Sequence, residues 1–297
     1  MKIAMIGKGA WGRAVGCALQ RNGHEVFFIE RAHTQWPVEI QKPDFIFLAL
    51  PCQVIRERLT ALKIPKAPIV SLTKGIEIGT GLRATQILKE ILPSHATAVV
   101  SGPSFAIEVE QQMPTAVVAA AQSEKLAQKT QEILHQKIFR VYRSKDVVGV
   151  ELGGALKNVY AIAGGVCEGL RIGRNAMAGL LTRCLAEMVR IACDLGAKKE
   201  TLYGLSGMGD LMLTAYSGLS RNHQIGEYLG AGKNLSEALQ KVQGVAEGIY
   251  TSQALYRVVQ EKQIKAPVLT EVYRVLHENK SPMSALHDLL LRQVNEE

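Results

Sequence analysis

The sequence lacks any long hydrophobic run. Its longest apolar stretches, such as 45–50 and 116–121, are far shorter than the roughly 18 to 20 residues that a membrane-spanning helix needs. Only four apolar residues lie between Lys2 and Gly7, fewer than the roughly 7 to 15 in the core of a signal peptide. We therefore expect a protein without a membrane span that stays in the cytoplasm.

Cysteines are few, and their spacing matches no common framework. The five residues are odd in number and scattered along the chain: Cys17, Cys52, Cys167, Cys184 and Cys193. None belongs to a CxxC pair that a second pair or two histidines could complete. The pattern predicts neither a disulfide framework nor a zinc site, and we expect no metal.

Aromatic residues make up only 5% of the chain, and the basic residues form no long block. Both features argue against nucleic acid as a partner, because little is available for base stacking. The formal charge is nevertheless positive, 35 − 27 = +8. Small anionic ligands are therefore the better match to this charge. The length of 297 residues suits about two domains of ordinary globular composition.

Short apolar runs alternate with helical patterns over the first half of the chain. The predicted strands are 2–6, 26–29, 45–50, 69–72, 97–101, 115–119 and 139–142. The predicted helices are 11–22, 54–62, 83–92, 105–111 and 123–134. Because the strands are apolar throughout, they predict a mostly parallel sheet that is covered on both faces.

Strand signals stop after about residue 145, and helical periodicity continues to the end, interrupted by predicted glycine-rich turns at 204–209 and 226–232. We therefore predict an α/β protein with a Rossmann-type domain at 1–145 and an all-α domain at 146–297. Nothing near 143–147 resembles a flexible linker, so we expect the two halves to pack closely.

A glycine turn follows the first predicted strand. Gly7, Gly9 and Gly12 fit the GxGxxG pattern between a strand and a helix, and Glu30 stands at the end of the second strand. In this context the glycines allow a tight turn, close approach of a pyrophosphate, and helix packing on the strand. The pattern predicts a dinucleotide cofactor.

The pair Glu30 and Arg31 leaves open which dinucleotide is bound. A carboxylate at this position accepts a hydrogen bond from the ribose 2′-OH of NAD, whereas an arginine can pair with the 2′-phosphate of NADP. A solvated ion pair without a ligand is an equally good interpretation for either residue alone.

Lys157 is the candidate catalytic residue. Its predicted helix starts near residue 150, and Gly153, Gly154, Ala161 and Gly164 share its face, so a ligand or another backbone could approach closely. Burial there would lower the pKa of the ammonium group towards the working range of a proton donor. The alternative is a surface lysine, which is the usual fate of this residue type.

Other candidates stand at predicted loop and helix boundaries. Lys74 follows a strand, where ligands of open α/β sheets bind. Ser104 and Asp210 could each be simple helix caps, and Pro103 suits a first helical turn. The sequence Ser220-Arg221-Asn222 opens a predicted helix at 221–229, which could hold a phosphate or be a plain cap beside a solvated arginine.

Seven ordered motifs resemble the bacterial-type NAD(P)-dependent glycerol-3-phosphate dehydrogenases nearly end to end. They are the glycine turn 7–12, Thr73-Lys74-Gly75-Ile76-Glu77, the segment 101–108 beginning Ser-Gly-Pro-Ser-Phe-Ala, Leu-Gly-Gly-Ala-Leu-Lys-Asn at 152–158, Gly-Met-Gly-Asp-Leu at 207–211, Ser-Arg-Asn at 220–222 and Val-Ala-Glu-Gly at 245–248. The resemblance implies the interconversion of dihydroxyacetone phosphate and sn-glycerol 3-phosphate with NADH or NADPH, which supplies phospholipid synthesis.

The resemblance also implies roles for single residues. Lys157 would be the proton donor to the carbonyl and the acceptor in reverse. The implied substrate contacts are Lys74, Gly102, Ser104, Lys157, Asp210, Ser220, Arg221 and Asn222. The implied cofactor contacts are Gly7, Gly9, Ala10, Trp11, Gly12, Glu30, Arg31, Lys74, Ala106, Arg221, Val245 and Glu247. The resemblance further suggests a homodimer.

The chain departs from the family pattern in two places. The segment 31–43 is some thirty residues shorter than in most relatives, near the adenosine end of the cofactor, and Glu30 replaces a residue that is commonly small. We therefore expect use of both cofactors, with NADPH less favoured than is usual. Two alternatives remain: a dehydrogenase of another small phosphorylated or CoA-linked hydroxy acid, and a redox sensor that binds NAD(P) without turnover.

Overall fold

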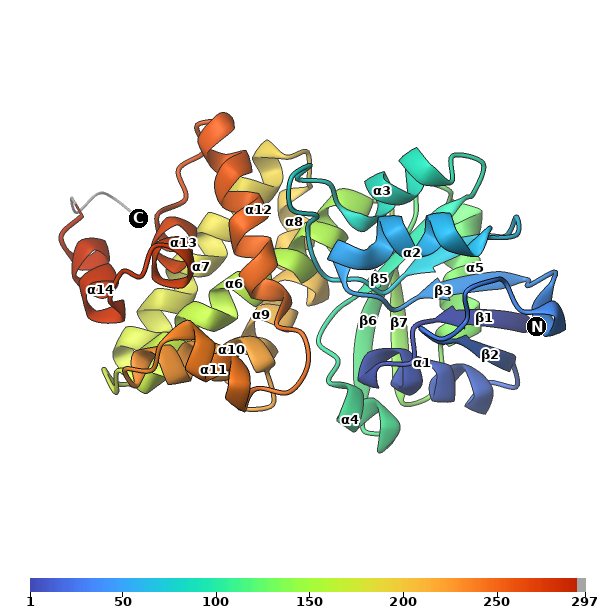
Figure 1. Ribbon diagram of the computed structural model, residues 1–297, viewed down its shortest axis with the longest axis horizontal. Helices are drawn as coiled ribbons and strands as arrows, with labels where there is room; N and C mark the ends of the chain where they lie inside the picture. Colours follow the sequence, from blue (N-terminus) through green and yellow to red (C-terminus); the bar gives the residue numbers. More distant parts are fainter. Residues whose placement is uncertain (293–297) are drawn as a thin grey trace.

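The computed structural model describes residues 1–292, and Figure 1 shows a sheet half beside a helical half. The strands are β1 (Lys2–Ile6), β2 (Glu25–Ile29), β3 (Phe45–Leu48), β4 (Ile69–Ser71), β5 (Thr97–Ser101), β6 (Thr115–Ala120) and β7 (Phe139–Ser144). They form one sheet in the order β2-β1-β3-β4-β5-β6-β7, and only the β5–β6 pair is antiparallel. This confirms the predicted mostly parallel sheet.

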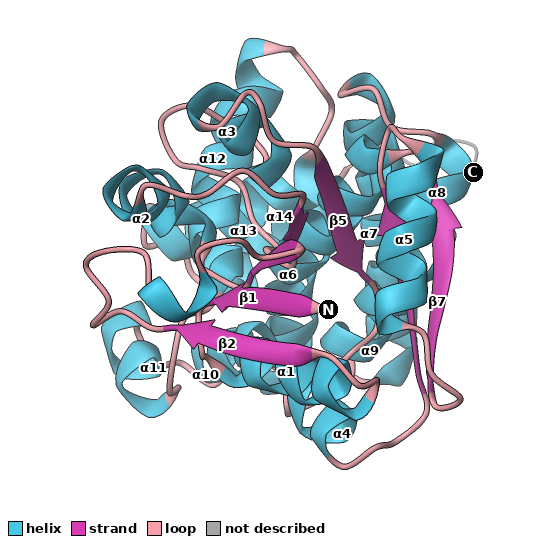
Figure 2. Ribbon diagram, turned by 90° about the vertical axis from the view of Figure 1, so that its right-hand side faces the viewer, coloured by secondary structure: helices cyan, strands magenta, loops and turns pink. Residues whose placement is uncertain are grey.

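Helices cover both faces of the sheet, as the apolar strands predict. The helices are α1 (Ala10–Arg21), α2 (Ile55–Leu62), α3 (Ala84–Ile91), α4 (Ala106–Glu110) and α5 (Glu124–Leu134). Figure 2 shows α2 and α3 on one side and α1 and α4 on the other, and the two buried clusters divide in the same way. Each predicted helix is present with ends within a few residues.

The crossover from β2 to β3 has no α-helix. Residues 30–44 contain only the short 3₁₀ helix η1 (Val38–Ile40). Trp36 holds it in place, since its indole Nε1 donates to the Ile40 carbonyl at 2.7 Å and its ring packs on the buried cluster below. The edge of the sheet beside β2 is therefore covered only thinly.

The second half is helical, as predicted. Its elements are α6 (Val147–Gly169), α7 (Arg174–Asp194), α8 (Lys199–Leu202), the π-helix η3 (Leu205–Gly209), α9 (Asp210–Ala215), α10 (Arg221–Gly230), α11 (Leu235–Lys241), α12 (Glu247–Glu261), α13 (Pro267–His277) and α14 (Pro282–Leu290). Residues 1–292 contain no helix that is long and apolar enough to cross a membrane.

The long helix α6 is the centre of this half, with α7, α9, α10 and α12 packed around it. Glycines allow α10 to approach closely: a methyl group on Gly165 would strike the backbone of α10, and one on Gly226 would strike the backbone of α6. The predicted turns at 204–209 and 226–232 are therefore only partly present, because residues 205–209 and 226–230 are helical. Gly204 has an extended backbone before η3, and Gly232 has a φ of +86° in the turn after α10. The glycines within the helices permit close packing.

Candidate active site

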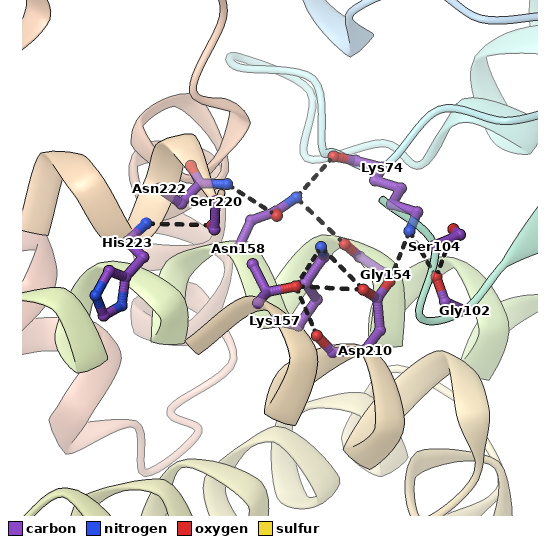
Figure 3. A network of polar contacts seen from close by, with 11 residues as sticks. Lys74, Gly102, Ser104, Gly154, Lys157, Asn158, Asp210, Ser220, Asn222 and His223 are labelled. Carbon is purple, nitrogen blue, oxygen red and sulfur yellow. Dashed lines mark hydrogen bonds and ion pairs between the residues drawn. The ribbon is translucent and has the colours of Figure 1, made fainter. Parts of the chain in front are cut away.

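The candidate site lies between the two halves. Lys74 follows β4 and Gly102 follows β5, so both stand at the carboxyl ends of parallel strands, where α/β sheets bind ligands. Helix α6 brings Lys157 to the same place, and α9 brings Asp210. Figure 3 shows these side chains converging from segments far apart in the sequence.

Asp210 holds two lysines. Its Oδ2 accepts a hydrogen bond from Lys74 Nζ at 2.6 Å, and its Oδ1 lies 3.1 Å from Lys157 Nζ. Lys157 also donates to Thr214 Oγ1 at 2.8 Å. Lys157 is only 7% exposed and Asp210 only 1%. The alternative of a surface lysine is therefore wrong, and the centre is a buried cluster of two ammonium groups and one carboxylate.

Burial shifts the pKa values of this cluster. Desolvation lowers the pKa of Lys157 to about 8, although the Asp210 carboxylate acts in the opposite direction. Desolvation alone would raise the pKa of Asp210, but the ammonium groups of Lys157 and Lys74 hold it below its ordinary value. The cluster thus contains an anionic carboxylate and a lysine that exchanges its proton near neutral pH.

The bare face of α6 serves close packing. A methyl group on Gly153 would strike the backbone of Ser206, and one on Gly154 would strike the Ser101 hydroxyl at the end of β5. The expectation that small side chains let another backbone approach this face is confirmed. Helix α6 can therefore lie against both the sheet and η3, which brings Lys157 and Lys74 to the same carboxylate.

The two helix caps that were the alternative interpretations of Asp210 and Ser104 are absent. Asp210 is the first residue of α9, but the preceding Gly209 already has helical backbone angles of −60° and −48°, because η3 runs directly into α9. No side chain caps this junction, so the Asp210 carboxylate is free for the lysines. Ser104 donates to the Gly102 carbonyl at 2.9 Å, and α4 starts later, after Phe105. Pro103 therefore lies outside the first helical turn.

The start of α10 agrees with its predicted cap. Ser220 Oγ accepts a hydrogen bond from the backbone N–H of His223 at 3.2 Å. Asn222 is buried and donates to Asn158 Oδ1 at 2.9 Å, while its own oxygen accepts from the backbone N–H of Gly248. The helix start is therefore tied to both α6 and α12.

Sequence reasoning assigned no role to Asn158 or Thr214. Asn158 Nδ2 donates to the carbonyl oxygens of Lys74 and Gly154, each at 3.3 Å. Thr214 lies one turn after Asp210 and contacts both Asp210 and Lys157. The i+4 spacing from Asp210 could have indicated Thr214. The connections of Asn158 depend on the fold.

Glu247 stands at the start of α12, beside the sheet half. Its Oε1 accepts from the backbone N–H of Cys52 at 3.2 Å, and its buried Oε2 has no partner within residues 1–292. Burial raises the pKa of Glu247 to about 7. Arg221 lies against Gly244 nearby, and Val245 is exposed. An unpaired buried acceptor at this junction is suited to a ligand donor.

The glycine turn has the geometry that a pyrophosphate requires. Gly7 has a φ of +101°, Gly9 has open space around the position of a side chain, and Gly12 packs against the Gly7 carbonyl. No side chain caps α1, which begins at Ala10, so the N–H groups of its first turn point outward. The indole Nε1 of Trp11 is buried and has no partner within residues 1–292. The turn therefore fits a dinucleotide.

The remaining cofactor candidates lie in the sheet half. Ala106 opens α4, whereas Glu30 and Arg31 follow β2 at the edge of the sheet. Glu30 Oε1 accepts from Lys8 Nζ at 2.7 Å, so Glu30 pairs with the glycine turn and belongs to a separate group from the Lys157 cluster. The described part of the chain holds no group of three or more metal-ligating side chains.

Family models match most of the chain. The model of the NAD-dependent glycerol-3-phosphate dehydrogenase C-terminus matches residues 146–287, and that of the N-terminus matches residues 2–41 and 34–127. The two N-terminal pieces overlap at residues 34–41, within the segment 31–43 that is shorter than in most relatives.

Proteins named glycerol-3-phosphate dehydrogenase, NAD(P)+, from Citrifermentans bemidjiense and Trichormus variabilis are 40% and 41% identical to this chain. The alignments cover 100% and 99% of this chain and 98% of each relative. The first spans 337 positions, 337 − 297 = 40 more than this chain has residues, whereas the second spans 300. Some relatives are therefore longer than this chain, whereas others have nearly the same length.

A crystal structure of glycerol-3-phosphate dehydrogenase from Coxiella burnetii superposes on this chain with a TM-score of 0.91. The sequence identity is 34%, and the superposition covers 98% of this chain and 99% of the other. The similarity therefore includes both halves and their connection.

Proposed function

The chain belongs to the NAD-dependent glycerol-3-phosphate dehydrogenase family, and we propose that it interconverts dihydroxyacetone phosphate and sn-glycerol 3-phosphate with NADH or NADPH. The observation that carries the proposal is the buried cluster in which Asp210 holds Lys157 and Lys74 at the carboxyl ends of the strands. A centre of this kind is suited to carbonyl reduction, which needs a proton donor and positive charge at the developing alkoxide.

The chemistry divides between cofactor and protein. The bound nicotinamide supplies a hydride, with its electron pair, to the carbonyl carbon. Lys157 Nζ gives a proton to the carbonyl oxygen, so C=O becomes CH–OH and the lysine is left neutral. In the reverse direction the neutral amine takes the hydroxyl proton. Lys74 adds positive charge beside the oxygen, and Asp210 orients both ammonium groups.

The substrate is held from both halves in this proposal. Ser220, Arg221 and Asn222 receive the phosphate at the start of α10, where backbone N–H groups and a guanidinium favour an anion. Gly102 and Ser104 approach the glycerol oxygens from the end of β5. The support is the orientation of these segments towards the Lys157 cluster.

The residues assigned to the cofactor extend from the β2 edge to the Lys157 cluster, so a bound dinucleotide would be held along the sheet half. The pyrophosphate is held by the glycine turn, through Gly7, Gly9, Ala10, Trp11 and Gly12. The adenosine ribose is held by Glu30 and Arg31. Towards the nicotinamide end we assign Lys74, Ala106, Arg221, Val245 and Glu247. The unpartnered Trp11 Nε1 and Glu247 Oε2 support this path, since each is a buried polar atom to which a ligand could bind.

We assign the cofactor domain to 1–145 and the substrate domain to 146–297, of which 293–297 lie outside the described residues. The proposal places the protein in the cytoplasm as a homodimer that supplies glycerol 3-phosphate for phospholipids. Light scattering on the purified protein tests the dimer.

The function is tested by following NADH and NADPH oxidation with dihydroxyacetone phosphate and with unphosphorylated dihydroxyacetone. We expect turnover that strongly prefers the phosphorylated substrate. Lys157→Ala should lower kcat by about 100- to 10,000-fold, the typical contribution of a general acid, while NADH still binds. The exposed Lys89→Ala on α3 is the matched control. No turnover of dihydroxyacetone phosphate with either cofactor would refute the proposal.

A further inference from the structure

Three cationic residues stand at or near the end of β2. Lys8 reaches the site from the glycine turn, Arg31 follows Glu30 in the chain, and Arg58 reaches it from α2, donating through Nη2 to the Glu30 carbonyl at 2.6 Å. Glu30 is the single carboxylate in this group of four. The group, which we call the ribose-edge cluster, therefore carries a formal charge of 3 − 1 = +2.

Only one of the three cations, Arg31, belongs to the crossover from β2 to β3, in which residues 30–44 form no α-helix. Lys8 occupies the second position of the glycine turn and extends across to Glu30, passing the Phe28 ring at 5.7 Å. Lys8 thus lies between the pyrophosphate-binding turn and the residue that faces the adenosine ribose.

The Lys8–Glu30 ion pair is easily exchanged. Both side chains are about half exposed, at 45% and 46%, and an exposed pair of this kind is only weakly stabilising. The backbone around it is held more firmly, because Arg58 binds the Glu30 carbonyl and His33 Nδ1 accepts from the Glu30 N–H at 3.0 Å. The ion pair can therefore exchange partners through its side chains while the Glu30 backbone keeps these two hydrogen bonds.

NADH and NADPH make opposite demands here. A ribose 2′-OH donates a hydrogen bond to a carboxylate, whereas a 2′-phosphate brings about two negative charges that a carboxylate repels. We propose that Lys8 distinguishes the two cofactors by changing its binding partner. With NADH it stays on Glu30 Oε1 and leaves Oε2 for the 2′-OH. With NADPH it leaves Glu30 and binds the 2′-phosphate together with Arg31. The inference rests on the proposed dinucleotide site.

The test is the dissociation constant measured by calorimetry for NADPH, NADH and adenosine 2′,5′-bisphosphate. Lys8→Ala should weaken NADPH and the bisphosphate by about 10- to 100-fold, the loss of one charge-assisted contact, and change NADH less than about threefold. Lys42→Ala is the control, since it removes an exposed lysine at the other end of the same crossover. Glu30→Ala should tighten NADPH and weaken NADH.

A uniform loss for both dinucleotides in Lys8→Ala, or an unchanged constant for NADPH, would overturn the inference. Lys8→Gln keeps the stem of the side chain and should behave like the alanine variant, which separates loss of charge from a disturbed turn. Because these readouts are binding constants, they are independent of turnover. A protein that binds both cofactors as described but reduces no dihydroxyacetone phosphate would refute the proposed function alone.

Discussion

At the scale of single residues, the proton-transfer properties of Lys157 depend on its surroundings. Burial favours the neutral amine and the Asp210 carboxylate favours the ammonium ion, and the balance brings the pKa of Lys157 to about 8. The charges of Lys74 and Arg221 also lower it. A lysine in water would remain protonated throughout the neutral range, so it could not accept a proton in the reverse reaction.

This balance predicts a pH profile. The ammonium form donates the proton, so kcat/KM for reduction should be level below pH 8 and fall about tenfold per unit above it, whereas kcat/KM for oxidation should rise up to about pH 8. Asp210→Asn removes a charge that raises the pKa of Lys157 and should move the fall to lower pH. Lys74→Met should move it to higher pH. Steady-state measurements of kcat/KM against pH check this prediction. If the pH of the fall moved in the same direction in both variants, the prediction would be contradicted.

At the scale of elements, the substrate half depends on helices that pack with almost no side chain between them. Gly226 of α10 lies against the Ile162 carbonyl of α6, and Gly165 of α6 lies against the His223 carbonyl of α10. This close packing brings Asn222 Nδ2 within 2.9 Å of Asn158 Oδ1. Close packing of α6 and α10 therefore positions the proposed phosphate site relative to Lys157.

Gly226→Ala tests this packing. A methyl group would meet the backbone of α6, so the helices must separate, and we expect the free energy of unfolding to fall by about 1–3 kcal/mol. KM for dihydroxyacetone phosphate should rise as well. Gly179→Ala in α7 is the control, because its side chain would enter open space and should raise stability by up to about 1 kcal/mol. Urea unfolding measures the free energy of unfolding of both variants. Equal changes in the two variants would be evidence against close packing of α6 and α10 as the cause.

At the scale of the whole molecule, a buried ion pair joins the two halves. Glu151 of α6 accepts hydrogen bonds from the backbone N–H and the hydroxyl of Thr85 in α3, at 2.8 and 2.5 Å, and from the guanidinium of Arg83. Glu151 is only 4% exposed, and burial raises its pKa although Arg83 acts against this. The contact holds α6, which carries Lys157, against the sheet half, which carries Lys74.

Arg83→Met should leave this carboxylate buried without a cation and cost about 3–5 kcal/mol of stability at pH 7. The loss should be smaller at pH 5, because a carboxyl whose folded pKa is raised contributes stability as it becomes protonated. The double variant Arg83→Met, Glu151→Met should recover most of the loss. Thermal unfolding at both pH values measures this. A double variant as unstable as the single one would show that the pair is not the cause.

Local sequence patterns were sufficient to predict the fold class and the region of the candidate site. Apolar strands, a glycine turn and helical periodicity are local patterns. They predicted the parallel sheet, the helical half and the position of Lys74 at the carboxyl end of a strand. Local patterns also suggested caps at Asp210 and Ser104, which the continuous helix from η3 into α9 and the later start of α4 replaced.

Which side chains meet depends on the packing of the whole molecule. The pairing of Asp210 with two lysines, the links of Asn158, and the contact of Lys8 with Glu30 join residues that are distant in sequence. The pKa of Lys157 follows from the same packing, since burial is a property of the assembled molecule. Periodicity records which face of an element is buried, but the partner of that face depends on how the elements pack together.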